Sequence, residues 1–335
     1  MQGVECLPET IQKIASSVSK PTAASPVKSC NDGQKPKHKS RLFEYRDKVF
    51  GLASKLPMAS RLFKPVLRRS KDQSARKGAS DEALQGLKVY PSKTSSKVSF
   101  SFSGRSWLVF YELGVAQTLR DHVKQHILDE CVFLGASSGA LVAAAMALDL
   151  DLQYTKNVMK ERALAASKRL FGPISGMSRV LKNSLQEILP RSVSGLSDRL
   201  RISLTDAFTL EPVTSNRFES KEDLIDHILA SCYIPLLYET PTRVRGHLYI
   251  DGTLSDETPI IDELTVTSSP TSPKANISPA TGRYQSISQY FPSTDAKAIE
   301  QMFEDGKRDA LKWLCDAVEE GNLTSLLFRK FPKMP

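Results

Sequence analysis

Ser137 has the sequence setting of an enzymatic nucleophile. It lies at the centre of Gly135-Ala136-Ser137-Ser138-Gly139, between the apolar run Cys131-Val132-Phe133-Leu134 and an alanine-rich apolar stretch at 140–148. Glycines on both sides allow a sharp turn from a buried strand into a helix, which leaves the serine hydroxyl exposed at the helix amino terminus. The alternative is a small-residue turn that serves packing alone.

A serine nucleophile needs a base, and three residues are candidates. In a Ser-Asp-His hydrolase the histidine follows the serine along the chain, which leaves His227 and His247. His227 lies inside a predicted helix and His247 begins a predicted strand, so both are better explained as structural or surface residues. Asp251 ends an apolar strand, precedes Gly252, and is expected at the carboxyl edge of the sheet, where a buried carboxylate could act as the base. An ordinary Asp-Gly turn is the alternative.

The elements that must position these residues alternate along the chain. Strands are predicted at 97–102, 131–134, 200–205 and 247–250, and helices at 107–122, 140–148, 221–232 and 296–319, with further helices within 152–189. This order predicts an α/β fold with a mostly parallel central sheet. The predicted organisation is a basic, largely disordered region at 1–96, a catalytic domain at 97–265, a Ser/Thr/Pro-rich loop at 266–293 and a C-terminal helical extension at 294–335.

The charge is concentrated at one end of the chain. The net charge is +9, but residues 1–97 carry +12 and residues 98–335 carry −3. Within the basic part, residues 41–69 are amphipathic, which suits an anionic membrane or lipid-droplet surface. A helix that packs on the catalytic domain is an equally good interpretation. A nucleic-acid arm is disfavoured because no recognition motif is present.

Composition also limits the class of protein. Five dispersed cysteines without a Cys-x-x-Cys pair suggest neither a disulfide framework nor a metal site, and nothing implies a cofactor. No apolar stretch reaches the length of a membrane-spanning helix, and no secretory signal is evident. We therefore expect a cytoplasmic protein that associates peripherally with a membrane or lipid droplet.

Three motifs in one order resemble the patatin-like phospholipases, most of all the animal branch that contains adiponutrin and adipose triglyceride lipase. They are Ser101-Phe102-Ser103-Gly104 with the helix after it, the elbow at 135–141, and Tyr249-Ile250-Asp251-Gly252. The resemblance extends over residues 98 to about 316. It implies a three-layer α/β/α sandwich, a Ser137–Asp251 catalytic dyad that needs no histidine, and lipid acyl esters as substrates. Some relatives transfer the acyl group to an acceptor other than water.

The sequence departs from the family at the turn expected to bind the oxyanion. The family has Gly-x-Gly-x-x-Gly, whereas this chain has Gly104-Arg105-Ser106-Trp107-Leu108-Val109. Backbone N–H groups near Arg105 and Ser106 could still face the oxyanion, but a positive φ at Ser106 would cost about 1–3 kcal/mol, and a displaced donor would cost ~10²-fold in rate or more. Thr253 stands where the family has glycine or alanine. The sequence therefore predicts a lipid acyl hydrolase, with a lipid-surface regulatory protein or an acyl transferase of weakened hydrolysis as the alternative. It does not indicate a protein co-activator.

Overall fold

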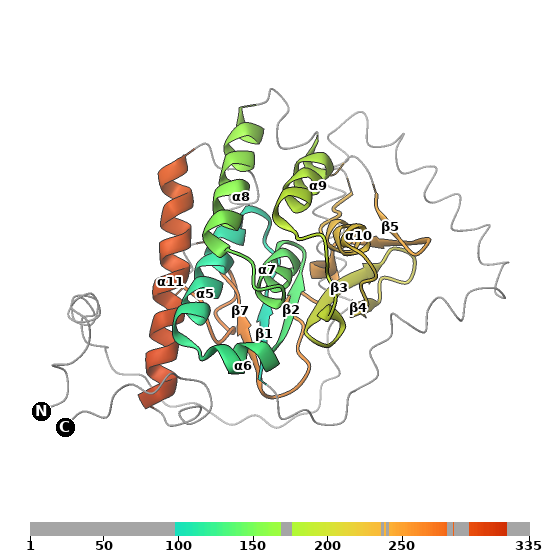
Figure 1. Ribbon diagram of the computed structural model, residues 1–335. Coiled ribbons are helices and arrows are strands. Elements are labelled where there is room, and N and C mark those ends of the chain that lie inside the picture. The colour runs from blue at the N-terminus through green and yellow to red at the C-terminus, as the bar shows by residue number, and fades with distance from the viewer. Residues whose placement is uncertain are drawn as a thin grey trace, which may run out of the picture. The chain divides into compact units, whose positions relative to one another are not determined.

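A mixed, mostly parallel sheet forms the centre of the computed structural model, and helices flank it (Figure 1). The structure describes residues 98–168, 176–235, 238, 241–279, 284 and 295–319. The amphipathic stretch at 41–69 and the region before residue 97 lie outside these residues. In the described part, no helix is long and apolar enough to cross a membrane, and no group of three or more metal-ligating side chains is found.

The strands and helices follow the alternation that the sequence predicts. The strands are β1 (Ser99–Phe102), β2 (Val132–Ala136), β3 (Leu200–Asp206), β4 (Pro212–Ser215), β5 (Arg243–Val244), β6 (His247–Ile250) and β7 (Thr265–Ser268). The helices are α5 (Val109–His122), α6 (Gln125–Glu130), α7 (Ser138–Ala147), α8 (Leu152–Ser167), α9 (Met177–Ile188), α10 (Lys221–Ser231) and α11 (Ala296–Glu319), with short 3₁₀ turns η1 (Ser106–Leu108), η2 (Leu196–Asp198) and η3 (Gly252–Leu254).

The sheet order is β5-β6-β3-β2-β1-β7, with β4 also paired to β3. The β3-β2-β1-β7 neighbours are parallel, and β4, β5 and β6 add antiparallel pairs. Strands β1 and β2 are buried along their whole length, as expected for parallel strands covered on both faces. The prediction of an α/β fold with a mostly parallel sheet is confirmed.

Strand β3 has three partners, and this determines where the site forms. Strand β2 pairs with residues 200–203 of β3, β4 with 202–205, and β6 with 205–206. Strands β2 and β4 both pair with Ile202 and Ser203, and β4 and β6 both pair with Thr205. Because a strand has only two edges, β4 lies on one edge of β3, and β2 and β6 both lie on the other. These two strands run in opposite directions, so their carboxyl ends face each other next to Leu204.

The predicted loop at 266–293 is wrong at its beginning, because Thr265–Ser268 form β7, parallel to β1. Three of the four residues of this strand are threonine or serine, which are also typical of a loop, although all four are buried. Strand β7 also pairs with the segment around Ile277, because the Ile277 N–H donates to the Thr267 carbonyl oxygen at 3.0 Å.

Helix α11 lies within the C-terminal helical extension that the sequence predicts at 294–335, and it belongs to the same compact unit as the sheet. It packs along α5, and two glycines permit the close approach (Figure 1). A Cβ atom on Gly114 would lie 2.0 Å from the Phe303 carbonyl oxygen, and one on Gly306 would lie 2.0 Å from the Tyr111 carbonyl oxygen. The two helix backbones are therefore in direct contact.

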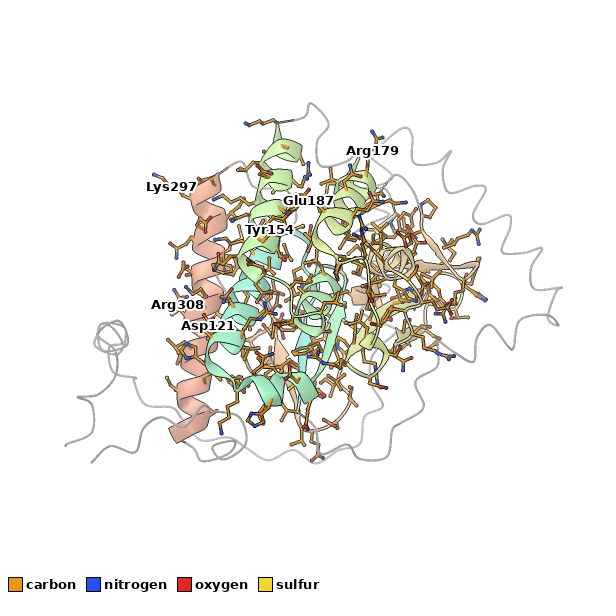
Figure 2. All side chains as sticks on the ribbon, in the orientation of Figure 1. Asp121, Tyr154, Arg179, Glu187, Lys297 and Arg308 are labelled. Atoms are coloured by element: carbon orange, nitrogen blue, oxygen red, sulfur yellow. The ribbon has the colours of Figure 1, made fainter. Side chains whose placement is uncertain are left out.

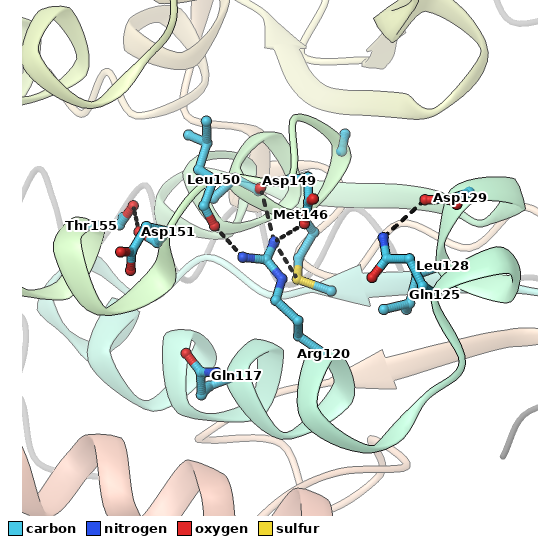
Figure 3. Close-up of polar contacts among 12 residues, drawn as sticks. Gln117, Arg120, Gln125, Leu128, Asp129, Met146, Asp149, Leu150, Asp151 and Thr155 are labelled. Atoms are coloured by element: carbon cyan, nitrogen blue, oxygen red, sulfur yellow. Dashed lines mark hydrogen bonds and ion pairs between the residues drawn. The ribbon is translucent and has the colours of Figure 1, made fainter. Parts of the chain in front are cut away.

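Arg120 ties the end of α5 to the end of the elbow helix α7. Its guanidinium group donates to the Leu150 carbonyl and lies 3.3 Å from the Asp149 carboxylate (Figure 3). Both acceptors belong to the turn that joins α7 to α8. This contact fixes the far end of the helix whose amino terminus carries Ser137.

Candidate active site

The sharp strand-to-helix turn that the sequence predicts around Ser137 is present, and its two glycines are required sterically. Ser137 joins β2 to α7 with φ 52° and ψ −126°, a backbone conformation that costs about 1–3 kcal/mol for a residue with a side chain. A Cβ on Gly139 would lie 2.1 Å from the Phe102 carbonyl oxygen, and one on Gly135 would lie 2.2 Å from the Gly139 carbonyl oxygen. Any side chain at either position would displace backbone.

Ser137 and Asp251 meet where β2 and β6 face each other. Ala136 pairs with Ser203 and Ile250 pairs with Thr205, so the next residue of each strand lies at the level of Leu204. The Ser137 hydroxyl donates to Asp251 Oδ2 at 2.7 Å. Both residues are buried. The geometry therefore brings together the two residues that the sequence paired.

Burial raises the pKa of Asp251, and hydrogen bonds oppose the rise. The Thr253 hydroxyl and the Thr253 backbone N–H both donate to Asp251 Oδ1, at 2.6 and 2.9 Å, and the Ser137 hydroxyl and the Arg105 charge also lower the pKa. A carboxylate held in this way is a stronger base than an exposed one. Thr253, which the sequence presented only as a departure from the family, is thus a direct partner of the predicted base.

Gly252 and Ser231 fix the backbone around the pair. A Cβ on Gly252 would lie 2.1 Å from the Ser203 carbonyl oxygen, which explains the glycine after Asp251. The Ser231 hydroxyl donates to that same carbonyl at 2.7 Å and accepts the Ser137 N–H at 2.8 Å. Ser231 has no role in the sequence prediction, because a single serine at the end of a helix carries no distinctive signal.

The predicted oxyanion turn lies beside the nucleophile, with an altered geometry. Gly104 has no room for a side chain, since a Cβ there would be 2.5 Å from the Ser137 Cβ. Ser106 has φ 51°, the strained conformation considered from the sequence. The Arg105 side chain forms an ion pair with Glu257 at 2.5 Å, which links the turn to the segment after Asp251.

The Arg105 N–H, one of the predicted oxyanion donors, is directed elsewhere. It donates to the Ser138 hydroxyl at 3.0 Å. Ser138 itself begins α7, so its own backbone N–H is among those that a helix leaves unpaired at its start. The N–H after a nucleophile is a common oxyanion donor, although no residue type at this position marks it in the sequence, because every residue except proline carries a backbone N–H.

An apolar pocket opens onto Ser137. It is lined by Trp107, Val109 and Leu141 on one side and by Met159, Met177 and Leu181 from α8 and α9, with Ser106, Ser138, Val180, Cys232 and Tyr238 completing it. Its free volume is about 40 Å³, well below the ~300–1,000 Å³ of pockets that hold a ligand. An acyl chain therefore requires side chains to move, and unbranched methionines allow this most readily.

Helices α8 and α9 are linked on their outer side. The Tyr154 hydroxyl and the Arg162 guanidinium on α8 both donate to Glu187 on α9, at 3.3 and 2.7 Å, and Figure 2 labels Tyr154 and Glu187 on these neighbouring helices. These contacts hold the two helices that form the methionine side of the pocket.

The other nucleophiles and bases near the site are unsuitable. Cys232 lines the pocket, but burial raises the pKa of its thiol and keeps it neutral. His227 is buried against Phe218, and its Nδ1 lies 2.6 Å from the Asp223 carbonyl oxygen. His247 packs near Tyr249 on β6. Neither histidine is bonded to Ser137 or Asp251, in agreement with their interpretation as structural residues.

The structure thus combines an α/β fold with a strained serine at a strand-to-helix turn, hydrogen-bonded to a buried carboxylate. The family model described as patatin-like phospholipase matches residues 100–264. The chain thus contains a patatin-like phospholipase domain, of a family whose members are lipid acyl hydrolases and transacylases.

Curated relatives match over the same part of the chain. Human 1-acylglycerol-3-phosphate O-acyltransferase PNPLA3 is 30% identical over 241 residues, which covers 64% of this chain and 50% of that protein. Bovine patatin-like phospholipase domain-containing protein 2 is 34% identical and covers 57% and 40%. Human omega-hydroxyceramide transacylase is 31% identical and covers 49% and 32%. The chain thus spans half or less of the length of these relatives.

Among solved structures, VipD from Legionella pneumophila is 12% identical with a TM-score of 0.38, over 69% of this chain and 70% of that chain. A similarity of this size supports no conclusion.

Proposed function

We propose that the protein is a serine lipid acyl hydrolase, with acylglycerols or phospholipids as substrates. The observation that carries the proposal is the 2.7 Å hydrogen bond from the Ser137 hydroxyl to the buried Asp251 carboxylate, beside an apolar pocket. The apolar lining favours a fatty acyl chain as the group bound next to the nucleophile.

The reaction proceeds through an acyl-enzyme. Ser137 Oγ attacks the ester carbonyl carbon while its proton passes to Asp251, which gives a tetrahedral oxyanion. The oxyanion collapses, the bond to the leaving oxygen breaks, and that oxygen takes the proton from Asp251. Water then attacks the acyl-serine and gives a proton to Asp251. When the second tetrahedral intermediate collapses, the fatty acid leaves and Ser137 Oγ recovers the proton.

Acyl transfer is the second candidate function. The names of two relatives, an O-acyltransferase and a transacylase, favour it. The first half of the reaction is the same, and an acceptor hydroxyl replaces water in the second half. A lipid-surface protein with weakened hydrolysis is the third candidate, motivated by the altered oxyanion turn.

Substrate assays separate these functions. The purified chain is incubated with emulsified triacylglycerol and with phospholipid vesicles, in the presence and absence of a lysophospholipid or diacylglycerol acceptor. Hydrolysis releases free fatty acid, whereas transfer produces the acylated acceptor. Ser137→Ala is the matched control, and equal activity in both proteins would exclude Ser137 from the mechanism.

A fluorophosphonate probe tests the site without a choice of substrate. The wild-type chain should be labelled at Ser137, and Ser137→Ala should not. Asp251→Asn should also lose most of the labelling, because the amide cannot accept the serine proton. A folded wild-type chain that resists the probe would support the third candidate, the non-catalytic protein.

A further inference from the structure

Ser138 lies beside the nucleophile at the start of α7. It follows Ser137 directly, and it lines the same pocket as Ser137 and Ser106. Its oxygen accepts the Arg105 N–H at 3.0 Å. The turn that should supply N–H groups to the oxyanion thus directs one of them at a neighbouring hydroxyl.

The hydroxyl keeps one hydrogen-bonding function unused within the described part of the chain. A serine hydroxyl donates one proton and accepts at two lone pairs. One lone pair receives the Arg105 N–H, and no described residue accepts the Ser138 Oγ proton. Since the side chain lines the pocket, that proton can turn towards an oxygen bound there.

We propose that the Ser138 hydroxyl is a catalytic oxyanion donor, replacing the backbone donor that Arg105 would otherwise provide; this rests on the proposed acyl transfer chemistry. When Ser137 Oγ bonds to the carbonyl carbon, the carbonyl oxygen gains negative charge and accepts the Ser138 O–H. The proton stays on Ser138 throughout. As the intermediate collapses, the charge leaves the oxygen and the hydrogen bond weakens.

The Arg105 N–H makes the Ser138 hydroxyl a better donor. A hydroxyl that accepts a hydrogen bond is polarised, which strengthens the bond that it donates. The position of the donor is fixed, because Arg105 is held by Glu257 through an ion pair and an Nε hydrogen bond of 2.9 Å. A donor that needs no reorganisation stabilises a transition state most effectively.

A purely structural role for Ser138 predicts the opposite result. If its hydroxyl only keeps the Arg105 N–H away from the substrate, then removal of the hydroxyl releases that N–H and the rate rises. The sign of the change in kcat for Ser138→Ala therefore decides between the two roles.

The test compares kcat and KM of four variants with those of the wild type, with a soluble fatty acyl ester as substrate. Ser138→Ala should lower kcat by ~10²-fold with KM within about twofold, since the donor acts in the transition state. Ser138→Cys, whose thiol is a weak donor, should fall with it, whereas Ser138→Thr should retain most of the rate. Ser197→Ala, at an exposed position of η2, serves as the control and should match the wild type.

Two outcomes overturn the inference. An unchanged or increased kcat in Ser138→Ala excludes a donor role, and so does an equal loss in Ser138→Thr with native circular dichroism. Failure of the proposed function is distinguishable, because then the wild-type chain itself neither cleaves the ester nor takes up the fluorophosphonate at Ser137.

Discussion

Thr253 controls the basicity of the predicted base through two hydrogen bonds to one oxygen of Asp251. Burial raises the pKa of this carboxyl, and the Thr253 side-chain bond is the largest of the effects that lower it. Because the base must be ionised to accept the Ser137 proton, the pH dependence of the reaction reports directly on this contact.

We expect Thr253→Val to shift the acidic limb of the kcat/KM profile to higher pH. The substitution removes the hydroxyl while keeping the shape, so the pKa of Asp251 rises and less of it is ionised at a given acidic pH. Thr253→Ser keeps the donor and should follow the wild type. A limb that stays in place in Thr253→Val would show that Asp251 does not govern this part of the profile.

Glu112 is a second buried carboxyl, at the start of α5 behind the oxyanion turn. Its two oxygens accept hydrogen bonds from the hydroxyls of Ser103 and Ser268. Burial raises the pKa of Glu112 to about 8, the two serine bonds oppose the rise, and the charge of Glu257 adds to it. Near neutral pH the folded protein therefore keeps a proton on Glu112 that the unfolded chain releases.

The stability of the protein should consequently fall as pH rises from about 4.5 to about 8, the unfolded and folded pKa values of Glu112. Glu112→Gln cannot titrate, so its free energy of unfolding should fall less over that range than that of the wild type, by on the order of a few kcal/mol, and its Tm should decline less. Thermal melts of both proteins at several pH values measure this. Parallel Tm curves would mean that Glu112 titrates alike in the folded and unfolded chain.

At the scale of elements, the contact between α5 and α11 depends on the absence of two side chains. Gly306→Ala would place a methyl group against the Tyr111 carbonyl oxygen, which is backbone and cannot rotate away. We expect a loss of about 1–3 kcal/mol in the free energy of unfolding. Lys297→Ala, on the exposed side of α11 (Figure 2), should change it by less than about 0.5 kcal/mol. Denaturant titrations compare the two, and equal stability would mean that the helices separate without cost.

The sequence predicted the elements that carry strong periodic signals. Strand β6 and helix α11 begin and end where the residue pattern places them, and the elbow lies between β2 and α7 as expected. Strand β5 was missed because it has only two residues, and strand β4 was missed because it begins with proline, which is depleted in strands. Strand β7 was missed because its threonines and serine are typical of a loop when burial is unknown.

The site was predicted in its residue types and only partly in its contacts. The glycines around Ser137 and the Asp251-Gly252 pair carry local signals, so Ser137 and Asp251 could be named. The hydrogen bonds of Ser138 and Ser231 join segments that are far apart in the chain, and no local pattern of residues reports such contacts. The Thr253 bonds to Asp251 are local, but the residue pattern does not show that the threonine hydroxyl is directed at the carboxylate.

At the scale of the whole molecule, the separation of charge suggests how the enzyme reaches its substrate. The catalytic part of the chain, residues 98–335, has a net charge of −3, so it should gain little from an anionic surface. The basic amphipathic stretch at 41–69 lies outside the described residues, and its role in binding stays a proposal.

We expect the full chain to bind vesicles that contain phosphatidylserine, and to release them as salt is raised. Replacing Arg61, Lys64, Arg68 and Arg69 by glutamine should weaken this binding severalfold in a flotation assay while leaving cleavage of a soluble ester unchanged. The chain with Lys124, Lys221, Arg191 and Arg217 replaced is the matched control, since it loses the same charge elsewhere. Equal loss in both variants would assign the binding to overall charge and exclude a local surface at 41–69.

Strand β3 contributes no reacting group, yet it pairs with both β2 and β6, whose ends carry residues 114 positions apart in the chain. Insertion of one residue between Ser203 and Thr205 would shift Ser137 relative to Asp251, although the sequence motifs around both residues would be unchanged. Reaction of Ser137 with a serine-selective probe therefore also reports whether the chain has folded as far as β6. A nascent or truncated polypeptide that ends before β6 carries the complete elbow sequence but should not react with the probe.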